Sequence, residues 1–134
     1  MKTLGIIGGI APESTVAYYR AIIAEYKRRV TDGSQPPVII NSIDMMKMLG
    51  MIGEKKFAEV TDYLIGETEK LAKAGAQFGL FASNTPHIVF DRLRQRSPRG
   101  RRHVLRTQTD SARPQASRPD RTLPWTSVRR YWRP

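Results

Sequence analysis

The feature that most constrains the fold is a threefold alternation of short apolar runs and longer, one-sided helical patterns. The apolar runs are 3–7, 38–43 and 78–82, and Gly, Pro or polar residues bound each of them. Such runs are typical of buried parallel strands. The order strand–helix–strand–helix–strand–helix predicts an α/β fold, in which helices flank a parallel sheet in three layers through right-handed crossovers.

Each helical stretch has a recognisable start and a single apolar face. The first begins at Pro12, with the acidic Glu13 in its first turn. Its apolar residues recur every three or four positions and predict one buried face: Val16, Tyr19, Ile23, Tyr26 and Val30. Asp44 can cap a short helix over 45–52. A long helix over 54–74 follows, with a predicted buried face of Phe57, Val60, Leu64, Leu71 and Ala74.

Three loops follow the predicted strands, at 8–13, 43–48 and 82–87. Ligands of open parallel sheets bind at the carboxyl ends of the strands, so these loops are the candidate site. In the third loop, Thr85 is a good N-cap and Pro86 suits the first helical position. The unpaired N–H groups of such a helix start can hold a small anion such as a carboxylate. On local evidence alone, an ordinary strand-to-helix turn with a capping Thr explains the stretch better.

Other motifs are weak or exclude a class of site. The glycines of 5–9 do not spell a dinucleotide fingerprint or a Walker loop, so we expect no nucleotide cofactor. Lys47 can serve as a point charge for a substrate carboxylate or be a solvated surface Lys, with equal weight. His87 fits a structural hydrogen bond better than catalysis. The chain has no Cys, which rules out disulfides and thiolate metal sites, and we expect no metal.

The chain changes character near Ser97. Residues 1–96 carry a net charge of +3 and residues 97–134 carry +8, which together make the +11 of the whole chain. The second part lacks Lys and is rich in Arg, Pro, Ser and Thr, without a sustained hydrophobic period. We therefore predict an α/β lobe over 1–96 and a disordered basic tail over 97–134. The tail's Arg residues and its Trp residues allow an alternative function, nonspecific binding of nucleic acid.

No run suggests a membrane or export signal. No apolar stretch approaches the ~20 residues that a membrane-spanning helix needs. The N-terminal run leads through glycines into a helix, and is therefore read as a core strand and not as a signal peptide. We expect no membrane partner and a cytoplasmic location.

Three segments together resemble the aspartate/glutamate racemase family, the cofactor-independent amino-acid racemases. They are GIIGGIAPESTVAYY (5–19), NSIDMMKML (41–49) and FASNTPHIVFD (81–91), in the family's order and at its spacing. The resemblance covers roughly residues 1–98. It implies a substrate that is a small acidic amino acid, no cofactor, and two acid/base residues that exchange the proton at Cα between two similar lobes.

The resemblance also assigns roles to individual residues. Ser83 occupies the position of one acid/base residue, which is usually a Cys in the family. Asn84 and Thr85 match positions that hold the substrate's carboxylate and amino groups. The first loop matches through Glu13 and Ser14, and the second loop through Lys47.

This chain departs from the family in three ways. Ser83 replaces the thiol, and a hydroxyl is a much poorer base than a thiol of pKa ~8.5. Ala11 stands where relatives often have Ser, so a side-chain cap is lost. The second lobe and its Cys are missing, which suggests a truncated or frameshifted gene. We therefore expect an inactive or severely impaired racemase that can self-associate as a homo-oligomer, because its sheet edge is uncovered.

Overall fold

The sheet of this protein is wholly parallel. The computed structural model describes residues 1–96 and 103–105. The strands run in the order β2-β1-β3-β4, with every neighbouring pair parallel. Their bounds are Leu4–Gly8 for β1, Val38–Ser42 for β2, Phe78–Phe81 for β3 and His103–Leu105 for β4. The predicted parallel α/β fold is confirmed.

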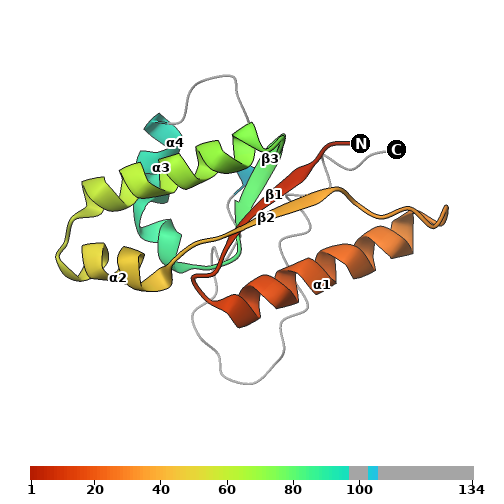
Figure 1. Cartoon of the computed structure of the whole chain (residues 1–134), viewed down its shortest axis with the longest axis horizontal. Helices are drawn as coiled ribbons and strands as arrows, with labels where there is room; N and C mark the ends of the chain where they lie inside the picture. The colour runs from red at the N-terminus through yellow and green to blue at the C-terminus, as the bar shows by residue number, and fades with distance from the viewer. Residues whose placement is uncertain (97–102, 106–134) are drawn as a thin grey trace.

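Helices cover both faces of this sheet (Figure 1). Helix α1 lies on one face, whereas α2, α3 and α4 lie on the other. Their bounds are Pro12–Arg29 for α1, Met45–Gly53 for α2, Phe57–Lys73 for α3, Thr85–Val89 for the 3₁₀ helix η1 and Phe90–Arg96 for α4. The three layers follow from the alternation of side chains along each strand, which sends apolar residues to both faces.

Two clusters of buried side chains fill the space between these layers. The cluster under α2, α3 and α4 includes Ile7, Leu64 and Phe81, all at most 2% exposed. The cluster under α1 is smaller and includes Leu4, Ile6 and Ile22. Neighbouring residues of β1 thus contribute to opposite cores, as expected for a strand covered on both faces.

The sheet extends past the predicted end of the lobe. Residues His103–Leu105 pair with Phe78–Leu80 and form β4. The predicted boundary of the lobe was residue 96, and no strand was expected beyond it. Three residues are too few to show a hydrophobic period, which is why this strand was missed. The remainder of the predicted tail lies outside the described residues.

Helix α1 is rotated relative to the predicted buried face. Val16 is 49% exposed and Tyr19 is 42% exposed, so both were wrongly assigned to the core. Tyr26 is buried as predicted, and the other buried residues of α1 are Thr15 and Ile22. The rotation has a local cause, because the Thr15 hydroxyl accepts a hydrogen bond from the Gly9 N–H at the end of β1. A polar contact, which hydrophobic spacing does not report, therefore sets the orientation of this helix.

Candidate functional site

The carboxyl ends of the three N-terminal strands are tied together by backbone hydrogen bonds. The N–H of Ile43 donates to the carbonyl of Gly8 over 2.9 Å, which joins the ends of β1 and β2. The N–H of Ala82 donates to the carbonyl of Ile7, also over 2.9 Å, which joins β3 to β1. The three predicted loops therefore begin side by side at one edge of the sheet.

The first loop begins with two glycines, Gly8 and Gly9, that have no room for a side chain. Gly9 has a φ of +86°, a left-handed conformation that favours glycine. A Cβ at Gly9 would lie 2.5 Å from the carbonyl oxygen of Ile43 and 2.5 Å from Oγ of Ser42. One at Gly8 would lie 2.4 Å from Cγ2 of Thr15. The glycines thus allow the first loop to contact the second loop directly.

The buried Thr15 holds this loop against α1. Its Oγ1 accepts the N–H of Gly9 at 3.0 Å and donates to the carbonyl of Ala11 at 3.3 Å. Ala11 is the N-cap of α1 and makes no side-chain capping bond, as expected from its methyl group. Thr15 was not among the predicted site residues, although it fixes the loop that contains them.

Glu13 and Ser14 lie in the first turn of α1, directly after this loop. Glu13 is exposed, and it forms no ion pair with any residue in 1–96 or 103–105. Ser14 is half-buried. Both are therefore at the sheet edge that the sequence predicted, with the Glu13 carboxylate in solvent.

The loop after β3 places Ser83 half-buried, Asn84 exposed and Thr85 half-buried. The predicted N-cap role of Thr85 is wrong. The hydroxyl of Ser83 accepts the Thr85 N–H at 3.3 Å, and Thr85 is itself the first residue of η1. A Ser that bonds to the N–H two residues on forms a local turn of its own, which competes with a cap at Thr85. The same bond orients the Ser83 oxygen.

Lys47 lies in the first turn of α2, capped as predicted by Asp44, whose Oδ1 accepts the Met46 N–H at 2.8 Å. The Lys47 side chain is exposed, and its Nζ lies 4.8 Å from the ring centroid of Tyr63 on α3. The amine therefore lies over a ring of α3, on an exposed side chain.

A polar cluster between β2 and α3 was not foreseen. The buried Glu67 accepts a hydrogen bond of 2.7 Å from Asn41 Nδ2 and another of 2.7 Å from Lys70 Nζ. Burial alone would raise the pKa of Glu67, but these two bonds and the charges of Lys70 and Lys47 lower it overall. Asn41 and Glu67 are separated by 26 residues, so no short-range sequence pattern could have paired them.

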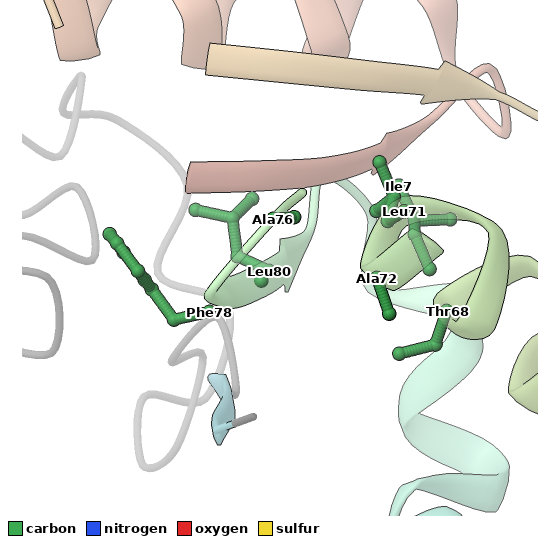
Figure 2. Close-up of a pocket in the computed structure, with 8 residues that line it drawn as sticks. Ile7, Thr68, Leu71, Ala72, Ala76, Phe78 and Leu80 are labelled. Carbon is green, nitrogen blue, oxygen red and sulfur yellow. The ribbon is translucent and has the colours of Figure 1, made fainter. Parts of the chain in front are cut away.

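A pocket elsewhere in the protein is a poor match for an acidic ligand. It lies between α3 and the strands β1 and β3, and it is lined by apolar and small side chains (Figure 2). Its lining residues are Ile7, Thr68, Leu71, Ala72, Ala76, Phe78, Gly79 and Leu80. None of these carries a charge, and none is a predicted site residue.

The described part of the chain contains neither a candidate metal cluster nor a candidate membrane-spanning helix. Residues 1–96 and 103–105 contain no group of three or more His, Cys, Asp or Glu side chains that could hold a metal ion. Within the same ranges, no helix combines the length and the apolar character needed to cross a membrane.

The strand-end loops offer groups that suit an amino acid. Ser83 has an oriented hydroxyl, and Asn84 and Thr85 add amide and hydroxyl groups that can both donate and accept hydrogen bonds. The loop after β3 leads directly into the 3₁₀ helix η1. These three polar side chains therefore follow one another at the carboxyl end of β3.

Comparison with known proteins identifies the family. Two solved structures are similar to this chain: an aspartate racemase homologue from Pyrococcus horikoshii OT3, with 32% sequence identity and a TM-score of 0.69, and a candidate Asp/Glu racemase from Yersinia pestis, with 27% identity and a TM-score of 0.72. Each match covers 79% of this chain but only 45% of the other protein, so the chain spans less than half of either. The sequence profile of Asp/Glu/hydantoin racemases matches residues 7–114. The chain therefore belongs to the Asp/Glu/hydantoin racemase family.

Proposed function

We propose that this chain forms one half of the amino-acid cleft of a cofactor-independent racemase and binds a small acidic amino acid. Ser83 is the acid/base residue of this half, and Asn84 and Thr85 hold the carboxylate and amino groups of the ligand. Glu13 and Ser14 border the cleft from α1. Lys47 supplies a cation for a ligand carboxylate.

The observation that carries this proposal is the junction of the three strand ends. The bonds from Ile43 to Gly8 and from Ala82 to Ile7 bring the loops with the family motifs to one edge. Family membership then links that edge to racemase chemistry. The substrate class is an inference from the family, because fold alone does not determine substrate.

The reaction needs a base on one face of the ligand and an acid on the other. A base removes the proton from Cα, the electron pair remains on a carbanion-like state, and an acid returns a proton to the opposite face. Backbone N–H groups near the ligand carboxylate can stabilise the charge that develops. No cofactor is required for these steps.

Ser83 is a weak base for this purpose. Its hydroxyl must lose a proton far less acidic than that of a Cys thiol, whose pKa is about 8.5. The chain contains no Cys that could serve as the second group. We expect the isolated polypeptide to bind an acidic amino acid but to racemise it at a negligible rate.

Exchange of the α-proton tests the role of Ser83 without requiring full racemisation. The full chain is incubated with L-aspartate in D₂O, and the loss of the α-proton signal is followed by NMR. Ser83→Cys should raise the exchange rate by about tenfold or more, because a positioned base contributes on the order of 10²–10⁴-fold. Ser83→Ala should reduce any exchange to the rate of aspartate alone.

Ser34→Cys is the matched control, because it adds a thiol before β2, at the opposite end of the sheet. It should leave the exchange rate at the wild-type value. Equal rates for Ser83→Cys and Ser34→Cys would refute the assignment of Ser83. Rapid racemisation by the wild-type chain would refute the expected loss of activity.

A further inference from the structure

The resting place of Lys47 is defined by α3 and not by the strand-end loops. Its Nζ lies over the ring of Tyr63, 4.8 Å from the centroid. A cation at this position is attracted by the negative face of the ring. The Lys47 side chain is exposed, so its contact with the ring is open to solvent.

The ring of Tyr63 is a fixed platform. Tyr63 is half-buried and packs against the core cluster that includes Leu64 and Met48. Burial raises the pKa of the Tyr63 phenol, and the nearby charge of Glu67 raises it further. The phenol is therefore neutral near neutral pH, and the Lys47 ammonium group lies over the face of its ring.

Glu67 adds an electrostatic attraction from the next turn of α3. Its side chain is 9% exposed, and Asn41 and Lys70 already occupy its two oxygens. The charge of Lys47 acts on this carboxylate from a distance, without a direct bond. Lys47 is thus attracted to α3 by two weak forces and by no close ion pair.

We propose that Tyr63 is a positioning residue that holds Lys47 in a resting position on α3, with Glu67 as the supporting charge, and that an acidic ligand draws Lys47 away. The proposal rests on the proposed function, because that function makes Lys47 a ligand for a carboxylate. On this proposal, a ligand must break the contact between Lys47 and Tyr63 before it binds Lys47, and this cost lowers its affinity. The flexible stem of Lys permits the ammonium group to move between the two positions.

The strength of the interaction between Lys47 and Tyr63 can be judged from its type, an exposed cation–π contact. An exposed cation–π interaction shifts an equilibrium by about two- to fivefold. A carboxylate that meets the ammonium group at short range can outcompete it, because charge-assisted hydrogen bonds are about twice as strong as neutral ones. The contact with Tyr63 therefore lowers the affinity for an acidic ligand by a small factor and does not prevent binding.

The first experiment measures the hold without any ligand. The full chain is treated with a limiting amount of acetic anhydride, and the rate of acetylation at Lys47 is compared with that at exposed Lys73 by mass spectrometry. Tyr63→Leu should raise the relative rate at Lys47 by about two- to fivefold. Tyr63→Phe keeps the ring and should leave the rate unchanged. An unchanged rate in Tyr63→Leu would overturn the proposal.

The second experiment tests whether a ligand draws Lys47 away from Tyr63. It measures the affinity of each variant for L-aspartate by NMR titration. Tyr63→Leu should bind about two- to fivefold more tightly than wild type, because no contact must be broken. Lys47→Met should bind more weakly, and adding Tyr63→Leu to Lys47→Met should change nothing further. Weaker binding by Tyr63→Leu would contradict the proposal.

The two experiments separate the two proposals. If aspartate binds to none of the variants while the acetylation rates change as expected, the proposed function fails and Tyr63 still holds Lys47. In that case, release by an acidic amino acid is refuted. If aspartate binds to all variants equally, the proposed ligand stands and the role of Tyr63 is wrong.

Discussion

The loops after β1 and β3 differ in how firmly the protein holds them. The loop after β1 is fixed by a left-handed Gly9 without space for a Cβ and by the buried Thr15. The loop after β3 leaves Asn84 exposed, and the Ser83 hydroxyl accepts the Thr85 N–H over a long 3.3 Å. This contrast indicates that the β1 loop is a rigid support, whereas the β3 loop contains the groups that would meet a ligand.

The largest expected effect is at the rigid support. We expect Gly9→Ala to destabilise the full chain by about 3–5 kcal/mol, because a left-handed alanine is strained and its Cβ would collide with the second loop. Urea denaturation followed by circular dichroism measures this loss. The matched control is Gly66→Ala in α3, where a Cβ meets nothing within 4 Å and alanine should stabilise the helix by about 0.5–1 kcal/mol. A Gly9→Ala variant as stable as wild type would contradict the conclusion that the β1 loop is a rigid support.

A smaller loss is expected at Thr15. Thr15→Val keeps the shape of the side chain but removes the acceptor for the Gly9 N–H, which is then left unsatisfied in a part-buried position. This should cost about 1–3 kcal/mol in the same denaturation experiment. A change below about 0.5 kcal/mol would mean that the hydroxyl does not hold the loop.

The stability that Glu67 contributes through its bond to Asn41 on β2 should depend on pH. The folded-state pKa of Glu67 lies below its ordinary value of 4.5, so this carboxylate contributes stability above about pH 4.5. That contribution is lost as the pH falls through the folded-state pKa of Glu67. Glu67→Gln can still accept the bond from Asn41 but cannot titrate, and its unfolding free energy should therefore fall less between pH 5 and pH 3. Identical pH profiles for the two proteins would contradict this role.

The strands and helices could be predicted from the sequence, but the polar contacts that orient them could not. The runs 3–7 and 78–82 became β1 and β3 because a strand covered on both faces is apolar throughout. The rotation of α1 was missed because it depends on the Thr15 hydroxyl, a polar group in a buried position. The link from Asn41 to Glu67 was missed because it joins residues far apart in sequence.

The candidate site shows the same division. The three loops could be expected side by side, because parallel strands end at a common edge, and backbone bonds join them there. The local geometry could not be predicted, since the sequence indicated a cap at Thr85, whereas the Ser83 hydroxyl accepts the Thr85 N–H. The resting position of Lys47 depends on Tyr63 from another helix, which no loop motif contains.

The smallest effect on stability is expected in the β3 loop. Ser83→Ala removes a single long hydrogen bond of a half-buried side chain, so the unfolding free energy should change by no more than about 0.5 kcal/mol. Urea denaturation should therefore separate this variant clearly from Thr15→Val. A loss as large as that of Thr15→Val would show that Ser83 supports the fold, and the contrast between the two loops would fail.

The proposed function requires that the sheet edge at the carboxyl ends of the strands binds an acidic amino acid. An NMR titration of the ¹⁵N-labelled full chain with L-aspartate tests this most directly. We expect saturable shifts of the amides of Gly9, Ser83, Asn84 and Thr85 with a common dissociation constant. Shifts confined to residues of the apolar pocket, such as Leu71 and Gly79, or the absence of saturable shifts, would contradict the account.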